Sequence, residues 1–156
     1  MSELTTKTTL HSRLCCFVDW IAPDPDKIDE IAERADRIRK LITQNAAEDG
    51  ITVVDTPKSG SFEKKTGLRR HYRGNSEVDG LDVDIPVVVN PKDDDGDTID
   101  ELLGKFEKYA EKSYPGQVKK TKSSIKITFS DGTSFDVVPM LATDKKNEQI
   151  IIRKDG

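Results

Sequence analysis

Three aspartates stand at positions from which their carboxylates could act together. Asp82 and Asp84 lie two residues apart in the segment LDVDIPVVV, and Asp136 lies in the later segment SFDVVPM. Because side chains alternate along a β-strand, Asp82 and Asp84 are expected on the same face, about 7 Å apart along the chain. If the later strand pairs beside the first, Asp136 joins them on that face.

Carboxylates gathered in this way repel one another unless a cation lies among them. Oxygen ligands alone select a hard cation such as Mg²⁺, with Mn²⁺ as the alternative ion. Two such ions, roughly 3.5 to 4 Å apart, would contact the attacking and the leaving oxygen of an in-line displacement at phosphorus. The sequence therefore predicts a two-metal catalytic site whose ligands are Asp82, Asp84 and Asp136.

A glycine-serine turn supplies a second expected site of phosphate contact. It lies in PKSGSFEKKTGLRR, where Gly60 would let backbone N–H groups approach an anion and Ser61 would add a hydroxyl donor. A run of cations follows it: Lys64, Lys65, Arg69, Arg70 and Arg73. We expect the turn to hold a triphosphate, delivered to the aspartates as its Mg²⁺ complex. A solvated loop is the alternative for the cationic run, and His71 is expected in that loop.

Two helices are predicted before this turn. Apolar residues at spacings of three and four indicate the first, from Leu10 to Ile21. The second starts at Pro25 with Asp24 as its N-cap and ends at Gly50. Its apolar stripe consists of Ile28, Ile31, Ala35, Ile38 and Ile42. The ion pairs expected on its other side, Glu30 with Arg34 and Glu33 with Arg37, are interpreted as a solvated face.

The remaining elements alternate between strands and one helix. They are strands over 51–55 and 81–89, a helix over 97–114, a hairpin over 122–141 that turns at Asp131-Gly132, and a strand over 148–154. Pro86 predicts a bulge or an edge in the second strand, and Phe135 and Val137 would face the packed side opposite Asp136. The order indicates an α+β fold, a mixed sheet flanked by helices, as a single domain over 1–156.

The composition excludes several classes of protein. Charged residues make up 35% of the 156 residues and hydrophobic ones 34%, and no apolar run reaches the length of a membrane span. The net charge of -4 argues against a broad nucleic-acid surface. Without a secretory signal the protein is expected in the cytoplasm, with Cys15 and Cys16 reduced and core or half-buried. Those cysteines and Trp20 are interpreted as helix packing.

Taken together, the motifs resemble the nucleotidyltransferase fold of the DNA polymerase β type. The shared pattern is a Gly-Ser turn, then DxD on a following strand, then a lone Asp on a later strand. Within that superfamily, SGSFEKKTGLR, DVDIPVVV and FDVVPML look most like the bacterial CD-NTases. These are relatives of cyclic GMP-AMP synthase that make cyclic di- or trinucleotide signals in anti-phage defence. The resemblance runs from about Ile28 to the end of the chain.

The resemblance implies a role for each motif. Asp82 and Asp84 would bind both metal ions, and Asp136 would complete the second metal site and help activate the attacking hydroxyl. The residues expected to contact the nucleotide are Gly60, Ser61, Lys65, Thr66 and Arg69. Nucleoside triphosphates such as ATP or GTP would be the substrates, and a regulatory protein is an expected partner. Family members carry a C-terminal helical lobe, so the chain is expected to be the catalytic lobe of a two-lobed protein.

Two other functions stay open at this stage. One is a nucleotidyltransferase that acts on an RNA end, a small-molecule hydroxyl or a protein side chain; the net acidity counts against RNA. The other is a nucleotide-binding module that keeps the fold without turnover. The three carboxylates favour an enzyme over the binding module.

Overall fold

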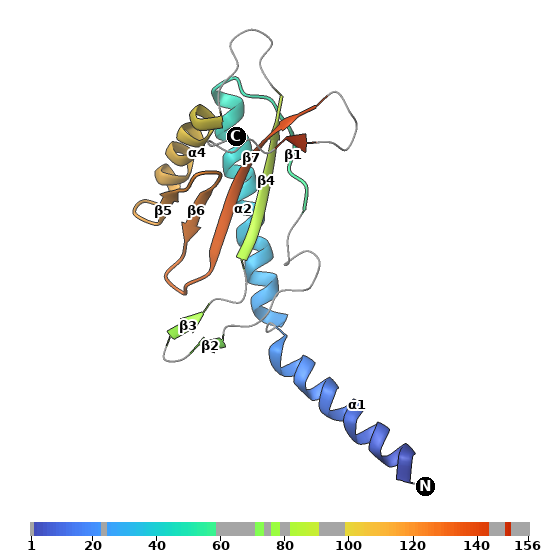
Figure 1. Cartoon of the computed structure of the whole chain (residues 1–156). Coiled ribbons are helices and arrows are strands. Elements are labelled where there is room, and N and C mark those ends of the chain that lie inside the picture. The colour runs from blue at the N-terminus through green and yellow to red at the C-terminus, as the bar shows by residue number, and fades with distance from the viewer. Residues whose placement is uncertain are drawn as a thin grey trace.

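A mixed six-stranded sheet is the centre of the fold (Figure 1). The structure is a computed structural model that describes residues 2–22, 25–58, 71–73, 76–78, 82–90, 99–143 and 149–150. The strands of the sheet are β1 (Val53–Asp55), β4 (Asp82–Val89), β5 (Val118–Lys120), β6 (Ile125–Thr128), β7 (Ser134–Ala142) and β8 (Gln149–Ile150). Their order is β1-β4-β7-β6-β5, with β8 also paired to β7.

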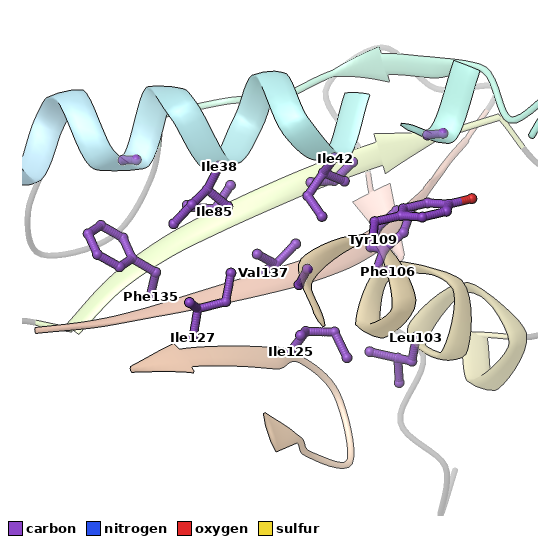
Figure 2. Packing of buried hydrophobic residues seen from close by; sticks show 14 of the residues in the cluster. Ile38, Ile42, Ile85, Leu103, Phe106, Tyr109, Ile125, Ile127, Phe135 and Val137 are labelled. Carbon is purple, nitrogen blue, oxygen red and sulfur yellow. The ribbon is translucent and has the colours of Figure 1, made fainter. Parts of the chain in front are cut away.

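Two helices, α2 (Pro25–Glu48) and α4 (Ile99–Ser113), pack on one face of this sheet. Figure 2 shows their apolar side chains meeting those of the strands, Ile38 and Ile42 from α2 above Ile85 and Val137. Two phenylalanine rings, Phe106 from α4 and Phe135 from β7, are fully buried in this core. The predicted stripe of α2 is confirmed except at its first member, because Ile28 is 36% exposed.

The two central strands, β4 and β7, run parallel. Their register is continuous over the whole of β4, from Asp82 opposite Ser134 to Val89 opposite Leu141. Pro86 lies opposite Val138 and does not interrupt the pairing of β4 with β7. On the other side, the described pairing with β1 involves only Val88 and Val89. Within the described residues Pro86 therefore lies at an edge, one of the two positions that the sequence predicted for it.

The predicted hairpin joins β6 to β7. The two strands pair from Ile125 opposite Val137 to Thr128 opposite Ser134. Between them Gly132 has a φ of 82°, and the carboxylate of Asp131 accepts a hydrogen bond from the N–H of Thr133 at 2.9 Å. A positive φ is strained for other residues, so the Asp-Gly dipeptide is what closes this turn.

The first helix, α1 (Ser2–Ile21), differs from its prediction in what it contacts. Figure 1 shows it extending away from the sheet and from the other helices. Its apolar residues are exposed: Leu10, Leu14, Phe17, Val18 and Trp20. Cys15 and Cys16 are also exposed, and both are free. The interpretation of Trp20 and the cysteines as buried packing residues was wrong, because the periodicity shows that a helix is amphipathic without showing what covers it.

Three short strands were not predicted. They are β5, and the β2–β3 hairpin formed by His71–Arg73 and Ser76–Val78. His71 therefore belongs to a strand, and the expectation of a loop at this position was wrong. No helix in the described part of the chain combines the length and the apolar character needed to cross a membrane.

Candidate active site

Three neighbouring strands bring Lys126, Asp136 and Asp84 into one row. On the parallel strands β4 and β7, Asp84 lies directly opposite Asp136. On the antiparallel strands β6 and β7, Lys126 lies directly opposite Asp136. Because directly paired residues point to the same face, the ammonium and both carboxylates share a face, and alternation puts Asp82 there as well.

The apolar neighbours of the acids explain why this face is turned away from the helices. Val83 and Ile85 flank Asp84, and Phe135 and Val137 flank Asp136; all four are at most 1% exposed and belong to the core. Burying these side chains against α2 and α4 forces the alternate residues to the opposite face of the sheet. The predicted placement of Phe135 and Val137 is confirmed.

Serine hydroxyls hold two of the three carboxylates. Ser134 Oγ donates to Asp82 Oδ1 at 2.9 Å, and Ser124 Oγ donates to Asp136 Oδ1 at 2.9 Å. Both serines are buried, at 6% and 8% exposure, whereas the side chain of Asp82 is 64% exposed and that of Asp136 is 17% exposed. The inner parts of the site are thus fixed by short bonds within the sheet.

A single ammonium bridges the same two carboxylates. Lys126 Nζ lies 3.2 Å from Asp136 Oδ2 and 3.6 Å from Asp82 Oδ1. Lys126 therefore reaches from β6 across β7 to β4. Burial alone would lower the pKa of Lys126, but the attraction of Asp136 and Asp82 outweighs it and raises that pKa, so the group is a cation at neutral pH.

The surroundings of Asp84 disfavour its charged form, whereas those of Lys126 favour the charged ammonium. The pKa of Asp84 is raised, first because burial disfavours the charged carboxylate and then because Asp136 and Asp82 repel it. Lys126 relieves only part of this repulsion. A carboxyl group held in such a place is stabilised in its charged form by any further cation that binds beside it.

The chemistry of these side chains fits a divalent cation. The carboxylates offer oxygen donors only, and the space between two of them already attracts a positive group. As the side chains lie, no three acidic, histidine or cysteine residues among those the structure describes could hold a metal ion together. The site has the charge for a metal, and two of its carboxylates, Asp82 and Asp136, are engaged by Lys126 and by the serines.

The glycine-serine turn, with Gly60, Ser61, Lys65, Thr66 and Arg69, lies outside the described residues. The direction of the chain that leads to it is described. β1 runs antiparallel to β4 and pairs with its last two residues. The chain that leaves β1 therefore starts out toward the beginning of β4, which is the end that carries Asp82 and Asp84.

Three residues of the site were missed by the sequence analysis: Lys126, Ser124 and Ser134. The signal for Lys126 was present, because a hairpin turning at Asp131-Gly132 brings the segment IKIT back opposite FDV. Its alternation puts Lys126 on the polar face together with Asp136. The serines had no such signal, since short hydroxyl side chains are common on any strand.

Comparison with known families decides where the chain belongs. The sequence model of the Second Messenger Oligonucleotide or Dinucleotide Synthetase domain, SMODS, matches residues 9–156. The chain belongs to this family. The SMODS match begins before Ile28, where the resemblance of the motifs begins, and it confirms the likeness to the CD-NTases. The comparison with curated proteins found no match.

Solved structures show the same fold as this SMODS domain. CdnC of E. coli MS115-1 with ATP has a TM-score of 0.65 at 24% identity, over 88% of this chain and 42% of that one. The complex of the same CdnC with HORMA-deltaN has a TM-score of 0.64 at 24% identity, over 88% of this chain and 42% of that one. The CD-NTase CdnG of Bradyrhizobium diazoefficiens with GTP has a TM-score of 0.63 at 23% identity, over 87% of this chain and 39% of that one. The predicted α+β nucleotidyltransferase fold is confirmed, and the chain spans less than half the length of these structures.

Proposed function

We propose that this SMODS domain is the catalytic part of a metal-dependent nucleotidyltransferase that joins nucleoside triphosphates into a cyclic oligonucleotide. The observation that carries the proposal is the meeting of Asp82, Asp84 and Asp136 on one face of the sheet, with Asp84 and Asp136 in direct register. Family membership supports the class of product, because the family is described as a synthetase of second messenger oligonucleotides or dinucleotides.

In this proposal Asp82, Asp84 and Asp136 hold two Mg²⁺ ions, or Mn²⁺ in their place. When bound, these ions neutralise phosphate charge and lower the pKa of a ribose hydroxyl. Asp136 would orient the attacking hydroxyl, and its own orientation is fixed by the hydrogen bond that Ser124 donates to its Oδ1. The attacking oxygen forms a bond to the α-phosphorus and pyrophosphate leaves with the electrons of the broken bond.

The glycine-serine turn would hold the triphosphate. Gly60 and Ser61 are assigned to phosphate contact, with Lys65, Thr66 and Arg69 around them. The course of the chain after β1, toward the acidic end of β4, supports this assignment. Positioning and neutralisation of charge would supply most of the rate.

The names of similar structures suggest substrates and a partner. Structures of CdnC with ATP, of CdnG with GTP and of CdnC with HORMA-deltaN support ATP or GTP as substrates and a regulatory protein as a partner of the whole protein. Following the resemblance to the CD-NTases, we assign the whole protein to cytoplasmic anti-phage defence.

The experiment supplies labelled ATP, GTP, CTP and UTP with Mg²⁺ or Mn²⁺ and treats the products with phosphatase. A phosphatase-resistant product is expected from the unchanged protein. Asp82→Asn and Asp136→Asn should each reduce it about 100-fold or more, because each removes a charge that the transition state needs. Glu33→Gln is the matched control, since this exposed acid on α2 pairs only with Arg37 at 3.1 Å, and it should leave the yield unchanged.

Other outcomes would point to the other functions. Release of pyrophosphate with label on an added acceptor, and no resistant cyclic product, would indicate a transferase for that acceptor. Nucleotide binding without release of pyrophosphate, in the unchanged protein and in both asparagine variants, would contradict an enzymatic role and leave a binding module.

A further inference from the structure

Lys126 is the only cation that the described residues place within ion-pair distance of Asp82 and Asp136. It comes from a third strand and touches carboxylates on two others. An ordinary surface ion pair on this protein is far more exposed: the side chains of Arg37 and Glu33 are 69% and 71% exposed. The side chain of Lys126 is 35% exposed and that of its nearer partner, Asp136, only 17%.

We propose that the Lys126 ammonium is a resident counter-ion, which holds the carboxylates of Asp82 and Asp136 together while no divalent cation is bound and which the cation must displace. The inference rests on the proposed function, since it concerns the same metal site. It adds Lys126 to the site as a residue that sets the affinity for the divalent cation.

The competition follows from the individual oxygen atoms. On Asp136, Ser124 donates to Oδ1, and the oxygen without a serine donor, Oδ2, is the one that Lys126 contacts at 3.2 Å. The other contact of the ammonium is to Asp82 Oδ1, which also accepts the hydrogen bond of Ser134. An ammonium and a divalent cation at contact distance from the same oxygens repel each other, so binding of the ion is opposed until Lys126 moves away.

The lysine side chain suits a counter-ion that has to leave. Its charge sits at the end of a flexible four-carbon stem, so the ammonium can swing into solvent without any change in the backbone of β6. Withdrawal also leaves the core packing of β6 intact, because Ile125 and Ile127 lie on the other face. The cost of displacement is thus mainly the electrostatic contact itself.

The test uses Mn²⁺ alone, without nucleotide, and measures its binding by isothermal titration calorimetry and by the electron paramagnetic resonance signal of free Mn²⁺. Lys126→Met keeps most of the stem and removes the charge, so it should bind Mn²⁺ about fivefold more tightly than the unchanged protein. Lys126→Gln is a second neutral variant with the same expectation. Lys126→Arg keeps the charge and should bind within about twofold of the unchanged protein. Lys108→Met removes the same charge from an exposed position on α4, across the sheet, and should also leave the affinity unchanged.

Thermal unfolding gives a readout that does not depend on activity. In EDTA, Lys126→Met should unfold a few degrees below Lys108→Met, because the ion pairs of Lys126 with Asp82 and Asp136 are lost; with saturating Mn²⁺ the difference should close. Equal Mn²⁺ affinity, or weaker binding in both neutral variants, would overturn the counter-ion while leaving the metal site intact. Failure of Mn²⁺ to bind to any variant would overturn the proposed metal site and this inference together.

Discussion

Hydroxyl groups fix the orientation of Asp136. Ser124 Oγ lies 2.9 Å from Asp136 Oδ1, and Thr121 Oγ1 lies 2.8 Å from Ser124 Oγ. A carboxylate only accepts and a hydroxyl has one hydrogen, so Ser124 donates to Asp136. Thr121 Oγ1 is left as a donor to Ser124, whose acceptor is either its Oγ or its backbone carbonyl oxygen, the latter at 3.0 Å. The two hydroxyl groups therefore hold the Asp136 carboxylate in one orientation.

Replacing Ser124 tests this arrangement. Ser124→Ala leaves Asp136 Oδ1 without its donor at a mostly buried position, and it should lower the free energy of unfolding by about 1 to 2 kcal/mol. Urea unfolding in EDTA measures the loss. Ser130→Ala, at an exposed position of the neighbouring turn, should change that free energy by less than about 0.5 kcal/mol. Equal losses in both variants would show that the Ser124 hydroxyl does not support Asp136.

The sequence led to the carboxylates more readily than to the residues that control them. Alternation within DVD and within FDV is a local rule, and it correctly placed Asp82, Asp84 and Asp136 on one side of their strands. Which strands are neighbours is not a local property, so the contact of Lys126 with two of these acids could not be predicted without the register of three strands. The glycine-serine residues and all the assigned roles stay predictions.

At the scale of elements, Arg34 connects α2 to the turn between β6 and β7. Its guanidinium bonds to Glu30 on its own helix and to Asp131 at 2.7 Å, and it lies 4.7 Å from the centre of the Phe129 ring. The interpretation of this side of α2 as a solvated face was therefore wrong at Arg34. Sequence spacing revealed the pair with Glu30, whereas the contacts with the turn required knowing where the helix packs.

The pair between Arg34 and Asp131 makes a prediction about pH. Burial would raise the pKa of Asp131, but the backbone N–H of Thr133 and the Arg34 guanidinium outweigh it and hold that pKa below its ordinary value of 3.8. A lowered pKa in the folded state means that the carboxylate stabilises the fold above pH 3.8, and that this contribution is lost as the pH falls through the lowered pKa. Asp131→Asn should therefore cost about 0.5 to 1 kcal/mol at pH 7, and this cost should shrink as the pH falls below 3.8 and through the lowered pKa.

Thermal or urea unfolding of both proteins between pH 7 and pH 2.5 measures this difference. The asparagine side chain can still accept the Thr133 N–H, so the comparison isolates the charge. Glu33→Gln, which removes an acid from a fully solvated pair, should show almost no difference at any pH. A constant gap between Asp131→Asn and the unchanged protein across the whole range would contradict the ion pair as its cause.

Short polar strands explain the elements that were missed. The sequences of β5, β2 and β3 are VKK, HYR and SEV. Three residues are too few to show a period of two, and most of these side chains are polar or charged, so nothing local separates them from loops. β5 forms because it pairs with β6 in the register Val118 opposite Ile127. Pairing in three dimensions, and not propensity, defines such strands.

For the molecule as a whole, stability should come from the layer between the sheet and its two helices. Ile38 is fully buried there, whereas Leu14 on α1 is 60% exposed. Ile38→Ala should lower the free energy of unfolding by about 2 to 5 kcal/mol, because it leaves a cavity in the core. Leu14→Ala should lower it by less than about 0.5 kcal/mol. Urea unfolding measures both, and a large loss in Leu14→Ala would show that α1 is part of the cooperative unit.

The parallel pairing of β4 with β7 has a consequence for how the chain acquires its acidic site. Asp82 and Ser134, which bond across the two strands, are 52 positions apart, whereas β5, β6 and β7 follow one another as antiparallel neighbours. Closing a long loop costs more entropy than closing a short one, so β4 should join a meander that has already formed. Amide protons of β4 should then become protected from hydrogen exchange last during refolding, and an intermediate that lacks this step would have the hairpin of β6 and β7 but not the row of acids.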